Sequence, residues 1–115
     1  AGFEIYDART AEEAEAALKT ARKDDSWFHT QKYPGSHVVV VGNGDIIPES
    51  TCRQAAIIAA YNSAASDSSQ VAVDYTEIRE LKKPAGGKPG MVIYHTYNTM
   101  WVTPDKELCE RLKKK

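Results

Sequence analysis

The chain has 115 residues, of which 42% are hydrophobic and 27% charged, a composition that fits one globular domain and excludes long disorder. No apolar run approaches the roughly 18 residues that a membrane span needs, and residues 1–9 lack a basic segment followed by an apolar one. The formal net charge of −1 excludes a protein that is basic over its whole surface. We therefore expect a single domain over residues 1–115, cytoplasmic and without membrane contact.

The charges are unevenly distributed along the chain. Residues 1–76 contain six Lys and Arg against eleven Asp and Glu, whereas residues 77–115 contain nine against five. Part of the positive charge belongs to the basic tail at residues 113–115, and the rest lies within the expected fold at Arg79, Lys82, Lys83 and Lys88. This distribution predicts a local cationic surface on an otherwise acidic domain. The two cysteines, Cys52 and Cys109, have no metal-binding spacing, so we expect reduced thiols, no metal and no cofactor.

The first half of the chain predicts a strand, a helix and a hairpin. Residues 2–6 alternate as a strand, and Thr10 with Glu13 fits a capping box that begins a surface helix over about 11–23. Strands at 26–30 and 37–41 flank a turn that contains Pro and Gly. Residues 38–41 are apolar on both faces of the pleat, so the second of these strands should be central in its sheet.

The second half predicts a buried helix followed by strands. A second capping box, Thr51 to Gln54, would begin an alanine-rich helix that ends near residue 65. Strands follow at 71–76, 91–96 and 99–103, the last two joined as a hairpin at Tyr97-Asn98. Thr103-Pro104 should cap a short C-terminal helix. The order predicts an α+β fold: a mostly antiparallel sheet with a buried Ala-rich helix and a surface N-terminal helix.

Several ordered motifs resemble the NFACT-R domain family. The motifs are DSWFHT at 25–30, PGSHVVV at 34–40, AAIIAAYNS at 55–63, VDYT at 73–76, KKPAGGKPGMVIY at 82–94 and VTP at 102–104. The resemblance covers about residues 2–104, leaving a short helix and basic tail at 105–115. It implies an RNA-binding module, for tRNA or rRNA, of proteins that bind the large ribosomal subunit in ribosome quality control.

The chain departs from the family pattern in its cations. After the first strand the family tends to carry a Gly-x-Asn segment followed by Gln-Asn-Asp. This chain instead reads Asp7-Ala8-Arg9-Thr10 and then an acidic helix, so only Arg9 of the family pattern is kept. Ala64, Ser66 and Gln70 stand where the family often has basic residues. Fewer cations release fewer counterions from RNA, so we expect weaker and less salt-dependent binding. The resemblance fits either an excised domain or a free-standing protein.

The Pro34-Gly35-Ser36-His37 motif has a structural and a functional interpretation. As a turn, it needs Pro34 to fix φ and Gly35 to take a positive φ. As a site, it would present His37 and the nearby His29 to a phosphate or a base. A Ser36–His37 dyad is disfavoured because neighbours on a strand face opposite ways, and two histidines lack a third metal ligand.

The lysine-rich bend at 82–90 could cradle phosphate or be a solvated loop, and it is no P-loop because it precedes a strand. Among the aromatic residues we favour Tyr33 and Tyr97 over Trp27 and Trp101 for base stacking, with Tyr94 also a candidate. Asp74 has no partner acid, so a strand-end hydrogen bond is favoured over catalysis.

We predict an RNA-binding module and not an enzyme. Two alternatives stay open: an accessory protein or subunit in tRNA modification, and a protein-interaction module whose acidic first helix docks a partner. The residues expected to contact RNA are His29, Lys32, Tyr33, Ser36, His37, Arg53, Arg79, Lys82, Lys83 and Lys88.

Overall fold

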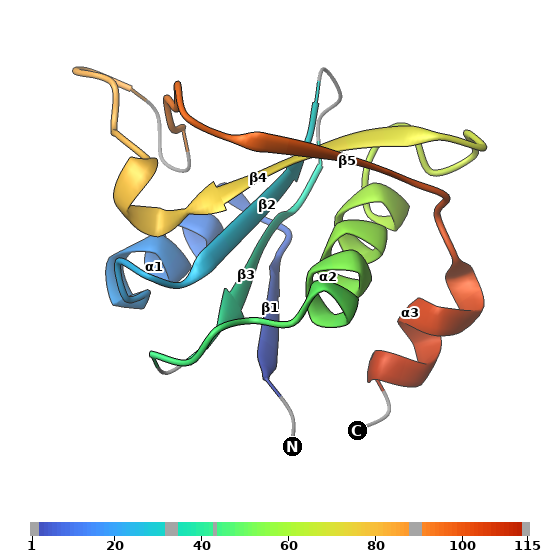
Figure 1. The fold of residues 1–115 in the computed structure, drawn as a ribbon. Helices are drawn as coiled ribbons and strands as arrows, with labels where there is room; N and C mark the ends of the chain where they lie inside the picture. The colour runs from blue at the N-terminus through green and yellow to red at the C-terminus, as the bar shows by residue number, and fades with distance from the viewer. Residues whose placement is uncertain (1–2, 32–34, 43, 88–90, 114–115) are drawn as a thin grey trace.

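A computed structural model describes residues 3–31, 35–42, 44–87 and 91–113 (Figure 1). It confirms the α+β class. The elements in chain order are β1 (Glu4–Ala8), α1 (Ala11–Thr20), β2 (Ser26–Thr30), β3 (His37–Val41), α2 (Glu49–Tyr61), β4 (Val71–Glu77), a 3-10 turn (Ile78–Glu80), β5 (Asn98–Val102) and α3 (Lys106–Lys113).

The strands form one antiparallel sheet in the order β1-β3-β2-β4-β5. β2 and β3 are neighbours, as the hairpin prediction requires. β3 lies between β1 and β2, and its Val38, Val39 and Val40 are buried, which confirms the prediction of a central strand. β1 and β5 are the two edges, so each has one side without a neighbouring strand among the described residues.

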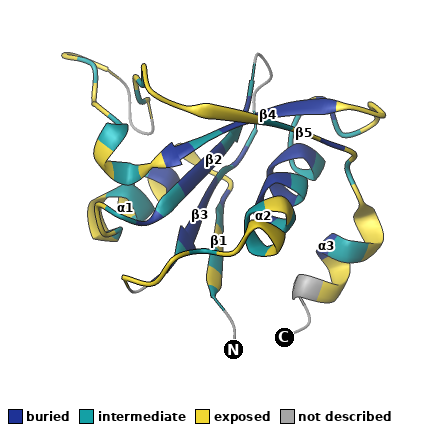
Figure 2. Ribbon diagram, in the orientation of Figure 1, coloured by how far each residue is buried: buried dark blue, intermediate teal, exposed yellow. Residues whose placement is uncertain are grey.

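The hydrophobic core lies between the sheet and α2. Alternation along the strands sends Phe28, Val38, Val40, Val71 and Val73 toward this helix. The helix contributes fully buried alanines at positions 55, 56, 59 and 60 to this core. Their small side chains let the helix backbone approach the sheet closely. α3 packs on α2, and α1 packs on β1 at the opposite face (Figures 1 and 2).

The helix ends confirm one capping box and correct the other. Thr10 accepts the Glu13 amide while Glu13 accepts the Thr10 amide, the predicted reciprocal pair. α2 instead begins at Glu49 after Pro48, which places Thr51 inside the first turn, so the second predicted box is wrong. A proline fits at this start because its missing N–H would have no partner there. None of the helices in the described ranges is long and apolar enough to cross a membrane.

The C-terminal third differs most from the prediction. Residues 91–96 form no strand, and their β-bridge is the one between Lys82 and Ile93. Side-chain contacts also hold the segment, because the Tyr94 hydroxyl donates to Asp74 and the Thr76 hydroxyl donates to the Thr96 carbonyl. β5 pairs with β4 and not with this segment, so the predicted hairpin at Tyr97-Asn98 is wrong. The cap of α3 is Asp105, which accepts the Leu108 amide, because the Thr103 hydroxyl is donated to the Ser69 carbonyl.

Gly35 is required for space and not for its backbone angle. Its φ lies outside the left-handed region, so the predicted positive φ is wrong. The residue bridges to Ser63 just after α2, and a Cβ built on it would lie 2.9 Å from the Ser63 Cβ. Glycine therefore lets the β2–β3 reversal pack directly against the end of α2.

Candidate nucleic-acid interface

The face of the sheet away from α2 carries a polar and aromatic cluster. Alternation places Trp27 and His29 of β2 on this face, together with His37 of β3 and Asp74 of β4. On the edge strand β5 it places Thr99 and Trp101 there, because Met100 and Val102 point into the core. We name this set, with Tyr94 and Tyr97 from the preceding segment, the aromatic face.

The buried Trp27 and two half-buried histidines form the centre of the aromatic face. Trp27 is 1% exposed, and its ring nitrogen donates a 2.9 Å hydrogen bond to Nδ1 of His37. The centroids of the His29 and His37 rings are 4.9 Å apart, and the Trp27 and His29 rings stack within 3° of parallel. The predicted approach of His29 to His37 across the reversal is therefore present.

Both imidazoles are neutral at pH 7. Burial lowers the pKa of His37 to about 4, helped by repulsion from His29, and burial also lowers the pKa of His29. An indole nitrogen can only donate, so His37 holds its proton on Nε2. From the sequence, a phosphate or a nucleobase was considered as the ligand of His29 and His37. Two neutral rings suit an uncharged nucleobase better than an anionic phosphate.

Asp74 organises the side chains around these rings. Its carboxylate is 3% exposed and accepts hydrogen bonds from the Tyr94 hydroxyl at 2.7 Å, the Thr99 hydroxyl at 2.9 Å and Gln31 Nε2 at 3.1 Å. These bonds join β4 to β5, to residue 31 after β2, and to the segment before β5. Asp74 therefore positions the aromatic face, in agreement with the hydrogen-bonding interpretation made from the sequence.

Two aromatic side chains of this face are open to solvent. Trp101 is 61% exposed and Tyr97 is 44% exposed, while the Tyr97 ring meets Tyr94 edge-on at 5.1 Å. The exposed course of β5 is visible in Figure 2. The sequence favoured Tyr97 over Trp101 for base stacking, a ranking that stays a prediction. Trp101 is nevertheless the more exposed of the two, and its alternation with Met100 and Val102 is a signal of this exposure. Tyr33 lies outside the described residues.

Several predicted cations follow β4, in or next to the 3-10 turn η1 (Ile78–Glu80). They lie at the opposite end of β4 from the β2–β3 reversal. The register pairs Glu77 with Ser26 at the start of β2, and the Arg79 amide donates to the Lys23 carbonyl. Arg79 pairs with Glu77 at 3.4 Å, and Lys83 pairs with Glu15 of α1. Lys82, which is exposed, is held by its backbone bridge to Ile93.

The remaining predicted contacts are dispersed. Arg53 is exposed on α2, across the sheet from the aromatic face, and lies 3.4 Å from Glu49. Ser36 is buried. Lys32 and Lys88 lie outside the described residues. Among the described residues, Arg79, Lys82 and Lys83 therefore lie away from the β2–β3 reversal, and Arg53 lies on the other side of the sheet.

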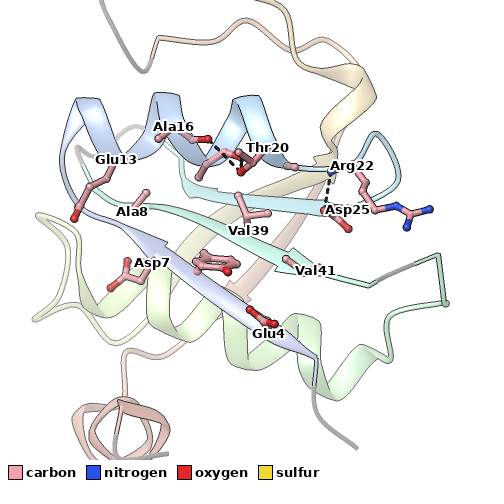
Figure 3. Close-up of a pocket in the computed structure, with 13 residues that line it drawn as sticks. Glu4, Asp7, Ala8, Glu13, Ala16, Thr20, Arg22, Asp25, Val39 and Val41 are labelled. Atoms are coloured by element: carbon pink, nitrogen blue, oxygen red, sulfur yellow. Dashed lines mark hydrogen bonds between the residues drawn. The ribbon is translucent and has the colours of Figure 1, made fainter.

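A groove of about 640 Å³ separates α1 from the sheet, and it faces the other edge strand, β1 (Figure 3). It is lined by Ala17 of α1 and by Val39 and Val41 of β3, and the carboxylates of Glu4 and Glu13 also line it. Carboxylates repel phosphate, so this groove is a poor site for RNA. Within the described ranges no group of three or more potential metal ligands is found.

The fold and its aromatic face define a small α+β binding domain. The family model of the NFACT protein RNA binding domain matches residues 1–96, and the chain belongs to this family.

The chain is similar in sequence to relatives named Rqc2 homolog RqcH. The protein from Bacillus subtilis is 51% identical over 96 residues, which is 84% of this chain and 16% of the relative. The one from Streptococcus pneumoniae is 46% identical over 101 residues, covering 87% of this chain and 18% of the relative. The chain thus spans less than a fifth of these proteins. A solved structure, the C-terminal of the fibronectin/fibrinogen-binding protein from Streptococcus suis, has a TM-score of 0.88 at 38% identity, covering 93% of this chain and 44% of that one.

Proposed function

We propose that this domain binds RNA through the aromatic face and serves a ribosome quality control protein. The observation that carries the proposal is the family match over residues 1–96, which includes Trp27, His29, His37, Asp74 and Tyr94 of that face and ends before Tyr97, Thr99 and Trp101. The relatives named Rqc2 homolog RqcH support the role in quality control. The RNA would be tRNA or rRNA, encountered at the large ribosomal subunit in the cytoplasm.

The same site favours binding over catalysis. Asp74 accepts three hydrogen bonds, and Nδ1 of His37 accepts one from Trp27. Groups engaged in this way hold their neighbours in place and are poorly placed to move a substrate proton. We infer that the domain contributes affinity and position to a longer protein.

Filter binding of the chain to total tRNA and to fragments of large-subunit rRNA tests this function. We expect retention of at least one RNA at low salt and its loss when Trp101 and Tyr97 are both changed to Ala. Arg53→Ala is a suitable control because that side chain lies across the sheet and should leave retention unchanged. Retention of no RNA at low salt would contradict the proposal.

A further inference from the structure

We propose that the domain takes RNA whose bases are unpaired, and that these bases stack on Trp101 and Tyr97 along edge strand β5. This inference rests on the proposed function and specifies the chemistry of its site. It concerns which part of the RNA carries the affinity: the faces of bases and not the phosphates.

The two rings are placed to receive successive bases. Both stand on the aromatic face, one near each end of β5, with the exposed Thr99 between them. Four residues of extended chain separate them by about 13 Å. No described strand lies beyond β5, so an RNA chain can run along this edge without displacing a neighbouring strand.

The charges near β5 favour bases over phosphates. Neither β4 nor β5 contains Lys or Arg, and the histidines behind them are neutral at pH 7. Some of the described cations elsewhere stand beside acids, as Arg79 does with Glu77 and Lys83 with Glu15. Each such exposed pair is weak, about 0–1 kcal/mol, yet a phosphate must still compete with the carboxylate.

Tyr94 holds the Tyr97 ring in place. Its ring packs edge-on against both Trp27 and Tyr97, and its hydroxyl is fixed on Asp74. A ring held in this way loses little conformational entropy when a base stacks on it. The faces of paired bases are covered by neighbouring bases within a duplex, so only unpaired bases can stack on exposed rings such as Trp101 and Tyr97.

Tryptophan fluorescence provides a direct test, because the chain has two tryptophans and Trp27 is buried. The probes are a ten-nucleotide single strand of mixed sequence and the blunt duplex of the same sequence. We expect the single strand to quench the emission and to bind at least tenfold more tightly than the duplex. Trp101→Phe should abolish the quenching but keep most of the affinity, measured with a labelled strand.

Truncation of the platform should weaken single-strand binding. Trp101→Ala or Tyr97→Ala should each lower affinity by about 5- to 150-fold, the range that stacking on one ring supplies. Tyr6→Ala is the matched control, since Tyr6 is 53% exposed on the other edge strand beside the acidic groove. It should change the affinity less than twofold.

The outcomes separate this inference from the function beneath it. If duplex and single strand bind equally, or if Trp101→Ala behaves like Tyr6→Ala, stacking is overturned while RNA binding stands. If neither probe nor any tRNA or rRNA binds, both proposals fail. The slope of the logarithm of the binding constant against the logarithm of the salt concentration gives a further test. A slope steeper than about −2 would indicate more than about three phosphate contacts and would also contradict the inference.

Discussion

The indole nitrogen of Trp27 donates a hydrogen bond to Nδ1 of His37 at 2.9 Å, in the middle of the aromatic face. This bond requires an unprotonated acceptor, so it ties the packing of the face to the charge of His37. The stacked His29 ring and the Tyr94 ring complete the same cluster. A proton on His37 would therefore remove the bond and add a buried charge.

We expect the domain to lose stability as the pH falls from about 6.5 toward 4. The pKa of His37 is about 4 in the folded chain against an ordinary 6.5, so the unfolded chain binds the extra proton within this window. The contribution is fully present above pH 6.5 and lost near pH 4. Its size is on the order of 2 kcal/mol after allowance for partial exposure of the ring. Urea unfolding at several pH values measures it.

His37→Asn should flatten that pH dependence, because asparagine keeps an acceptor near the indole but takes up no proton. His95 is exposed, and His95→Asn is the matched control that should leave the profile as it is. An unchanged slope in the His37 variant would assign the acid sensitivity to other groups, of which His29 is the nearest.

Asp74→Ala should destabilise the fold by about 2–4 kcal/mol, because three donors lose their buried acceptor. Asp74→Asn keeps one carbonyl oxygen and should cost about half as much. Asp67 lies exposed in a loop, so Asp67→Ala should stay within about 0.5 kcal/mol. Equal effects at positions 74 and 67 in urea unfolding would refute the organising role of Asp74.

Gly35→Ala should cost about 1–3 kcal/mol of stability through crowding against Ser63. Adding Ser63→Gly removes the Cβ that lies 2.9 Å from the new methyl group and should restore part of the loss. Gly86→Ala offers a contrast, because Gly86 has a φ of +71° and no atom within 4 Å of the added Cβ. That cost should be conformational and insensitive to Ser63. A double-mutant cycle at positions 35 and 63 without coupling would contradict the close packing.

Thr10→Ala should lower the free energy of unfolding by about 1 kcal/mol, because it opens the capping box at the start of α1. Glu12→Ala, in the same exposed turn but outside the box, should have a smaller effect. Thermal unfolding followed by circular dichroism compares the two. A larger loss in the Glu12 variant would show that first-turn charge outweighs the reciprocal hydrogen bonds.

Local signals predicted those elements that local physics decides. The Thr10–Glu13 box and the apolar run at 38–41 each report on their own surroundings, so α1 and the central strand were predicted correctly. The segment 91–96 has the composition of a strand, yet β4 was already paired on that side by β5. The choice between two competing strands depends on tertiary contacts that the local pattern does not contain.

The site was predicted in part for the same reason. His29 and His37 could be brought together from the hairpin, because the turn length fixes their proximity. The separation of Lys82, Lys83 and Arg53 depends on the strand order and on the side of the sheet that α2 covers. Charge counts along the chain carry no such information. The exposure of Trp101 follows from the register of β5, whose Met100 and Val102 point into the core, and not from composition.

An amide and indole NMR titration of the chain with an unpaired oligonucleotide tests the central claim most directly. Binding at the aromatic face predicts the largest shift changes at the Trp101 indole and along β5, with smaller changes at residues 94–97. The α1 groove and the exposed side of α2 should remain unperturbed. Shifts concentrated at Ala17 and Val41, or around Arg53, with none at Trp101, would contradict the account.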